Sequence, residues 1–246
     1  MRRIYFAALL LPLLVIPAMA QVPDLLSLIP ENSGTASGRL LQIAAVLTVL
    51  SVAPGLLIMV TSFTRLIVAL SFLRSGLGMQ TTPSNIVMTT LALFMTFYIM
   101  APTFDRAWNT GVQPLMANQI NEQEAYARVT EPFREFMLSQ VRSKDLQLFA
   151  DIAAANFSPP PDENAEVELR VLIPAFMISE LRRGFEIGFL IALPFLVIDM
   201  IVATLVMSMG MMMMPPTVLA LPFKVLFFVL IDGWNLLTGG LVRSFF

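Results

Sequence analysis

The 246-residue sequence contains no cysteine and no histidine, and only 13% of its residues are charged. Without cysteine there is no disulfide framework and no thiol chemistry. Without histidine, the commonest general base and the commonest transition-metal ligand are both missing. These absences exclude a serine–histidine triad, a zinc site and a histidine proton relay. We therefore expect neither an enzyme nor a protein that binds a metal or another cofactor.

The scarcity of charge also indicates the class of protein. The chain is 57% hydrophobic, whereas soluble domains usually carry about 25% charged residues. Such a balance is typical of an integral membrane protein. The formal net charge of −2 gives no sign of a basic surface for nucleic acid.

Residues 1–20 have the pattern of a cleavable signal peptide. Two arginines precede an apolar run from Ile4 to Val15, and Ala18-Met19-Ala20 is a small-x-small cleavage site. An uncleaved anchor helix is the alternative, but two prolines break the run and it is short for a membrane span. Residues 21–39 are polar and are expected to form a periplasmic loop.

The rest of the chain predicts an all-α protein in which two hydrophobic helical hairpins flank a polar domain. The hairpins are expected at residues 40–102 and 185–246, because each range holds two long segments with almost no charge. Arg65 and Arg74 mark a short, positively charged connection in the first hairpin, which the positive-inside rule places in the cytoplasm. The domain at 103–184 would then be periplasmic, and the loop of the second hairpin cytoplasmic.

The central domain holds 20 of the 32 charged residues, so we expect it to be exposed to water. Pro132 is expected to open one helix, because the apolar residues that follow recur at helical spacing. These residues are Phe133, Phe136, Met137, Val141, Leu146, Phe149 and Ile152. Residues 158–168, with three prolines and four acidic residues, predict an exposed linker.

Three ionisable residues interrupt the last two apolar segments: Asp199, Lys224 and Asp232. Charges at membrane depth are expensive, so they usually pair or face water. A proton path is one interpretation, but it would need histidine or several spaced carboxylates. A structural ion pair between Lys224 and either aspartate is the prediction we favour.

Methionine is concentrated between residues 207 and 216, in the sequence MSMGMMMMPP. Gly210 and the two prolines at 215 and 216 rule out a continuous helix, so a loop is expected. Copper ligation by thioethers is disfavoured, because consecutive residues cannot all face one ion and no histidine or cysteine assists. Two interpretations remain, which are ordinary core packing and a deformable apolar seal, since methionine adapts to irregular partners and needs no hydrogen bonds.

Four long stretches resemble the FliP family: Met59 to Gly78, Pro174 to Phe189, Pro194 to Pro216 and Leu221 to Trp234. The resemblance covers most of the chain. It implies a core subunit of the export gate of a flagellar type III secretion system. The signal peptide favours the flagellar branch over virulence systems, whose members typically lack one.

The resemblance also implies an architecture and partners. Such proteins form a pentamer that joins FliQ and FliR subunits and works with FlhB and the export apparatus in the inner membrane, within the flagellar basal body. Unfolded flagellar proteins pass through its centre. The methionine loop closes the empty channel as a gasket. These gasket residues correspond here to Met209, Gly210, Met211, Met212, Met213 and Met214.

Two other classes of function stay open. A small-solute or ion transporter should show binding residues within the membrane and often an internal repeat, and the sequence shows neither. A pure assembly scaffold is the other alternative, and ion leakage after deletion of the methionine loop would distinguish it from a channel.

Overall fold

The computed structural model describes residues 43–45, 47–48, 51–52, 55, 58–79, 81–156, 167–210 and 215–246. The predicted signal peptide at 1–20, the loop at 21–39 and nearly all of the predicted linker lie outside these residues. Met211 to Met214 also lie outside them. The chain divides into two units, Met1–Ala53 and Pro54–Phe246.

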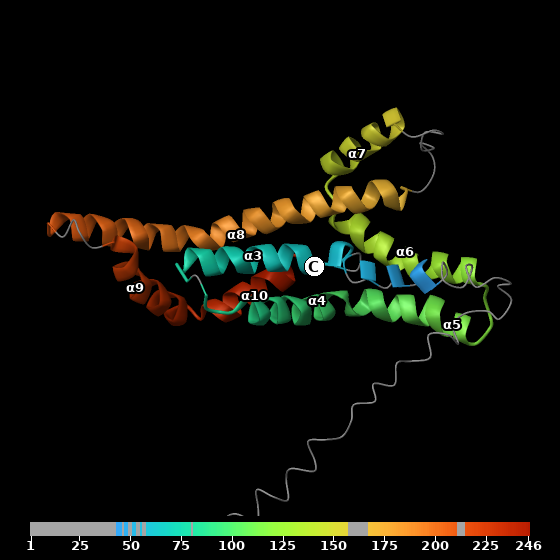
Figure 1. Ribbon diagram of the computed structural model, residues 1–246, viewed down its shortest axis with the longest axis horizontal. Helices are drawn as coiled ribbons and strands as arrows, with labels where there is room; N and C mark the ends of the chain where they lie inside the picture. Colours follow the sequence, from blue (N-terminus) through green and yellow to red (C-terminus); the bar gives the residue numbers. More distant parts are fainter. Residues whose placement is uncertain are drawn as a thin grey trace, which may run out of the picture. The chain divides into compact units, whose positions relative to one another are not determined.

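The described residues of the first unit are helical. The Thr48 hydroxyl donates to the carbonyl of Ala44, one helical turn earlier. In the second unit, residues 55, 58 and 59 are helical. They are followed by nine helical elements, drawn in Figure 1: α3 (Phe63–Gly76), α4 (Asn85–Ala107), the π-helical turn η3 (Trp108–Val112), α5 (Gln113–Met116), α6 (Glu122–Gln140), α7 (Ser143–Asn156), α8 (Leu169–Ser208), α9 (Pro216–Leu230) and α10 (Gly233–Arg243). No strand occurs in the described residues, and the all-α prediction is confirmed.

Helices α3 and α8 lie side by side and run in the same direction (Figure 1). Arg65 pairs with Glu180, and one helical turn further along each helix Val68 meets Gly184. A Cβ atom on Gly184 would stand 3.0 Å from the Cβ of Val68. Small residues at such positions let two helix backbones approach closely, so glycine on α8 sets the spacing of this pair.

The main hydrophobic core forms where α3, α4, α8, α9 and α10 meet. Leu66, Leu70 and Leu73 of α3 are at most 1% exposed and form its centre. Helix α4 adds buried residues at intervals of three and four, namely Met88, Ala92, Met95 and Ile99. This spacing is that of one face of a helix, so a single stripe of α4 is buried and its other face is left outward.

The predicted connection at Arg65 is wrong. Arg65 lies in the first turn of α3 and is fully buried, and the connection from α3 to α4 comes after Gly76, through residues 77–79 and 81–84. The reason is that Glu180 and other polar groups satisfy the guanidinium inside the protein, so this arginine does not mark a loop. Arg74, in the last turn of α3, does lie beside the turn.

The prediction that Pro132 opens a helix is also wrong. Helix α6 begins ten residues earlier, where Asn121 Oδ1 accepts from the backbone N–H of Glu124 at 2.8 Å. Such a cap stabilises a helix start. Pro132 lies inside α6 and cannot donate to the carbonyl of Arg128, but that carbonyl has the Thr110 hydroxyl of η3 at 3.4 Å. The predicted single helix is in fact two, because α6 ends at Gln140 and α7 starts at Ser143.

Helix α8 has 40 residues and crosses the predicted domain boundary at residues 184–185 without a break. Two helical stretches of the described residues are long and apolar enough to cross a membrane, Asn85–Met116 and Leu169–Ser208. Helices α9 and α10 would make a third if taken as one span, although they meet at 65°. Asp232 forms this bend in a left-handed conformation, with φ of 51°.

Candidate functional site: the methionine loop and the buried polar contacts

The methionine loop joins the end of α8 to the start of α9. Helix α8 ends at Ser208, and Gly210 takes a φ of +75°, a left-handed conformation that glycine adopts without strain. Pro215 is extended and α9 begins at Pro216. Helices α8 and α9 are therefore separate, as predicted from Gly210 and the two prolines. Met209 is 62% exposed, and no atom lies within 4 Å of where a Cβ on Gly210 would stand.

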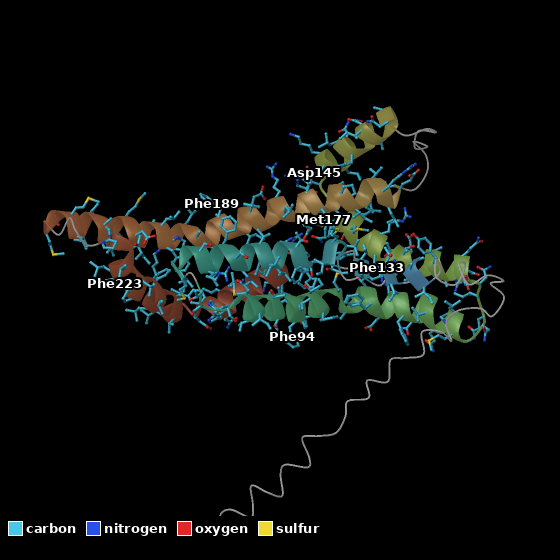
Figure 2. All side chains as sticks on the ribbon, viewed as in Figure 1. Phe94, Phe133, Asp145, Met177, Phe189 and Phe223 are labelled. Atoms are coloured by element: carbon cyan, nitrogen blue, oxygen red, sulfur yellow. The ribbon has the colours of Figure 1, made fainter. Side chains whose placement is uncertain are left out.

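An apolar groove of about 490 Å³ lies next to this loop, between α8 and α9. Its α9 wall is formed by Leu219, Phe223 and Phe227, and its α8 wall runs from Ile198 to Met209. Figure 2 labels Phe223 on α9. All nine lining residues are apolar, so the groove offers a surface without hydrogen-bonding side chains.

Lys224 and Asp199 form an ion pair. The sequence predicts that Lys224 pairs with one of two aspartates, Asp199 or Asp232, and the structure has it paired with Asp199. The distance from Lys224 Nζ to Asp199 Oδ2 is 2.6 Å. Lys224 is only 4% exposed, and its ammonium also donates to the carbonyl of Gly76 at 3.0 Å. The pair therefore ties α9 to α8 and to the end of α3. Asp232 is exposed and makes no ion pair within the described residues.

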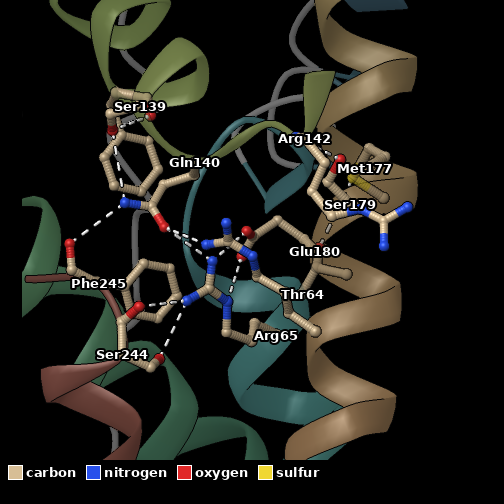
Figure 3. Close-up of polar contacts among 12 residues, drawn as sticks. Thr64, Arg65, Ser139, Gln140, Arg142, Met177, Ser179, Glu180, Ser244 and Phe245 are labelled. Atoms are coloured by element: carbon tan, nitrogen blue, oxygen red, sulfur yellow. Dashed lines mark hydrogen bonds and ion pairs between the residues drawn. The ribbon is translucent and has the colours of Figure 1, made fainter. Parts of the chain in front are cut away.

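A second buried polar cluster surrounds Arg65, shown in Figure 3. Its Nε donates to Glu180 Oε2 at 3.0 Å, and Nη2 donates to Glu180 Oε1. Nη2 also donates to Gln140 Oε1 at 3.0 Å, while Nη1 donates to the carbonyl and the hydroxyl of Ser244 at 2.9 and 3.0 Å. A guanidinium has five N–H donors, and these five hydrogen bonds satisfy all of them.

The Arg65 cluster joins four parts of the chain. Arg65 comes from α3, Gln140 from the end of α6 and Glu180 from α8, while Ser244 follows α10. The Phe245 ring lies over the guanidinium, with its centroid 3.7 Å from Arg65 Cζ. Breaking a buried pair of this kind typically costs about 3–5 kcal/mol, because it leaves one charge buried alone. The cluster therefore fixes the relative position of these four parts.

Ser179, next to Glu180 on α8, holds the start of α7. Its hydroxyl donates to Asp145 Oδ2 at 2.6 Å and accepts from the backbone N–H of Arg142 at 3.1 Å. The Arg142 guanidinium binds both oxygens of Asp145 at 2.9 Å. Chiefly through this hydrogen bonding by Arg142, with a smaller contribution from Ser179, the pKa of the Asp145 carboxyl lies below its usual range, although burial acts against this.

The sequence did not reveal the clusters at Arg65 and Asp145. One signal was available, because Arg65 is the first charge after the uncharged stretch that begins at Leu40. A charge in such a segment usually has a partner. Nothing in the sequence alone identifies Glu180 as that partner, since it lies 115 residues away and has two arginines nearby.

These clusters favour a structural role over a catalytic one. Each ionised group is engaged by a partner that holds two or more helices together. In the described residues no group of three or more histidine, cysteine, aspartate or glutamate side chains could hold a metal ion. The long apolar helix α8 is followed by the exposed Met209 and by Gly210. In its first half, α8 is held by the polar contacts of Glu180 and Ser179.

Comparison with known proteins places the chain. The sequence pattern of the FliP family matches residues 46–241. The chain belongs to the FliP family. It is 58% identical to the flagellar biosynthetic protein FliP of Agrobacterium fabrum over 246 residues, which is 98% of this chain and 99% of that protein.

Other relatives carry the same name. The flagellar biosynthetic protein FliP of Rhizobium meliloti is 63% identical over 212 residues, 86% of each chain. That of Bacillus subtilis is 49% identical over 216 residues, 88% of this chain and 95% of that protein. This FliP-family chain therefore combines membrane-length apolar helices with close similarity to flagellar biosynthetic proteins.

Proposed function

We propose that this FliP-family chain is a channel-forming subunit of the flagellar type III export gate. Several copies, five by the family resemblance, surround a path through which unfolded rod, hook and filament proteins leave the cell. The chain carries out no chemical reaction, and the energy for transport comes from partners or from the proton-motive force. FliQ, FliR and FlhB are the expected neighbours, in the inner membrane at the flagellar basal body.

The observation that supports this proposal is the geometry at the end of α8. An apolar helix of 40 residues stops at Ser208, the next residue Met209 is exposed, and Gly210 takes a left-handed conformation directly before the four consecutive methionines of the sequence. In a ring of copies, such loops would meet around the central path. Apolar side chains at a constriction exclude ions by dewetting, and flexible thioethers adapt to whatever chain passes.

The proposed arrangement assigns roles to the other parts of the chain. The signal peptide at 1–20 is removed, and residues 103–184 face the periplasm. The Lys224–Asp199 pair and the Arg65 cluster hold the helices that carry the loop. The loop itself, Met209 to Met214, is the seal.

Deletion of Met211 to Met214 tests this function in the assembled gate. We expect passage of ions and small solutes through the empty gate to rise, while the complex still assembles with its neighbours. The matched control is Met116→Ala, which removes an exposed methionine of α5 outside the loop and should leave leakage at the wild-type level. Unchanged leakage in an assembled deletion variant would contradict the role of the methionine loop as a seal, and a scaffold role would then be favoured.

A further inference from the structure

Two opposite charges in the apolar part of the chain have no charged partner among the residues that the structure describes. Arg74, in the last turn of α3, donates to the neutral amide oxygen of Asn85. Asp232, at the bend between α9 and α10, is exposed and joins no ion pair in the described part of the chain. Charges in apolar surroundings usually have a partner, so we expect each of these two to meet an opposite charge.

The two charges lie at the same level of the helix bundle. A Cβ on Gly76, two residues after Arg74, would stand 3.0 Å from the ring of Phe195. The centroid of that ring is 6.3 Å from the centroid of the Phe228 ring, and Phe228 lies in the last turn of α9, four residues before Asp232. Figure 1 likewise shows the end of α3 and the bend between α9 and α10 at one level along α8. Two copies side by side would therefore need no shift along the helices for these charges to meet.

Each charge is accompanied by an apolar feature, and the two features are complementary. Beside Asp232 lies a groove of about 190 Å³, and both sequence neighbours of Asp232 belong to its apolar lining. Leu236 also lines this groove and is 63% exposed. On the other side, Asn85, which binds Arg74, is followed directly by Ile86, which is 75% exposed. An exposed isoleucine beside the cation can therefore fill an apolar groove beside the anion.

The two patches are built from different elements of the chain. Arg74 and Ile86 belong to α3 and α4, whereas the groove beside Asp232 is lined by α8, α9, α10 and the bend, without any residue of α3 or α4. A contact between two different patches of identical chains is heterologous, and such contacts close into a ring when the rotation permits. In a closed ring every copy offers one patch to each neighbour, so no charge is left unpaired.

We propose that Arg74 of one copy pairs with Asp232 of the next copy, and that Ile86 enters the groove beside that aspartate. The inference rests on the proposed function, which places several copies around a path, and it adds the residues through which neighbouring copies touch. The end of α8 lies beyond this level in Figure 1, so the contact joins the copies at a distance from the methionine loop.

A disulfide between copies tests the contact, because the chain has no native cysteine. Two tagged forms of the chain are produced together, one with Ile86→Cys and one with Leu236→Cys, and both keep Arg74 and Asp232. In the assembled gate, a thiol oxidant should join the two forms covalently. The control is Phe94→Cys with Leu236→Cys. Phe94 is similarly exposed, at 70%, but lies about 12 Å further along α4. A disulfide joins Cα atoms about 4.4–6.8 Å apart, so the control pair should stay unlinked.

Exchange of the two charges gives a second, independent test. Asp232→Arg should lower the yield of the complex and the export of protein several-fold, because it places a second cation opposite Arg74. Adding Arg74→Asp to the same chain should restore most of both, since each contact then holds the pair in reverse, and such a rescue excludes misfolding as the cause of the loss. Asp232→Arg with Arg243→Asp is the control of equal net charge. Arg243 lies at the far end of α10, so this variant should stay as impaired as Asp232→Arg alone.

Three outcomes would overturn the contact between copies. An assembled gate in which the cysteines at Ile86 and Leu236 stay unlinked would show that a lipid or another subunit covers one of the patches. A wild-type yield of Asp232→Arg would show that the aspartate has no cation opposite it, and failure of the double exchange to restore assembly would show that this cation is not Arg74. The proposed function can still hold in each case, because deletion of the methionine loop tests it separately.

Discussion

Arg65 and Glu180 form a bidentate ion pair in which neither side chain is exposed to solvent. The pair joins α3 to α8 at the level where the polar and apolar parts of the chain meet. Gln140 and Ser244 bind the same guanidinium. Loss of the pair should therefore also disturb the end of α6 and the residues that follow α10.

We expect Glu180→Ala to lower the free energy of unfolding by about 3–5 kcal/mol, because it leaves the guanidinium buried without its counter-charge. Arg65→Lys should also destabilise the protein, since an ammonium cannot replace the fork of five donors. Denaturation of the purified complex in detergent measures both. Breaking the exposed Arg182–Glu186 pair by Arg182→Met is the control and should cost less than about 1 kcal/mol. Equal effects of Glu180→Ala and Arg182→Met would contradict the role assigned to the buried pair.

Lys224→Met should reduce assembly and export several-fold. It leaves the Asp199 carboxylate without its cation and the carbonyl of Gly76 without its donor. Adding Asp199→Asn should restore part of the loss, because no unpaired charge then remains. The yield of complex and the amount of exported protein are the measurements. Asp151→Asn, at an exposed position of α7, serves as the control and should stay near wild type, and a fully active Lys224→Met variant would rule out a structural role for the pair.

The attachment of α7 should weaken in acid. Because the pKa of Asp145 is lowered in the folded protein, the carboxylate adds stability that is fully present above its unfolded pKa of about 3.9. That stability is lost as the pH falls through the lower, folded pKa. Proteolysis of α7 by pepsin between pH 5 and pH 2 follows the change. Asp145→Asn should detach α7 at neutral pH and remove the acid transition, while Asp151→Asn, at an exposed position, should keep it.

Gly188→Ala should push α3 and α8 apart. A Cβ at this position would stand 2.6 Å from the ring of Phe72, and overpacking of this kind costs about 1–3 kcal/mol. Gly239→Ala is the matched control, because it lies in α10 with no atom within 4 Å of the new Cβ. There alanine should be neutral or stabilise by up to about 1 kcal/mol. Thermal denaturation of the two variants compares them, and equal loss at both sites would contradict the close approach at Gly188.

The sequence predicted the parts of the fold that depend on local pattern. The long uncharged segments indicated helices, and Gly210 with the two prolines marked the break after α8, because these features act on the residues beside them. Lys224 was correctly given a carboxylate partner, since a lone charge in an apolar segment needs one.

Errors arose where distant residues decide the structure. In the sequence, Arg65 looks like a charged residue of a loop. In the structure it is surrounded by Glu180, Gln140 and Ser244, and no local sequence pattern indicates these contacts. Pro132 looks like a helix start because it breaks most helices, yet the cap at Asn121 lies outside the apolar pattern that we followed. The packing of α3 along α8 was also not predicted, because hydropathy gives segments and not their neighbours.

The separation of Arg65 and Glu180 along the chain has a consequence in time. The two residues are 115 positions apart, and at a synthesis rate of about 5–20 residues per second this interval lasts roughly 6–23 s. During that interval α3 holds a guanidinium that has no counter-charge, at an expense of about 2.5–3.5 kcal/mol if it lies at membrane depth. The first hairpin of a newly made chain should therefore sit shallowly at the membrane surface and take its final position only after the first half of α8 has emerged from the ribosome.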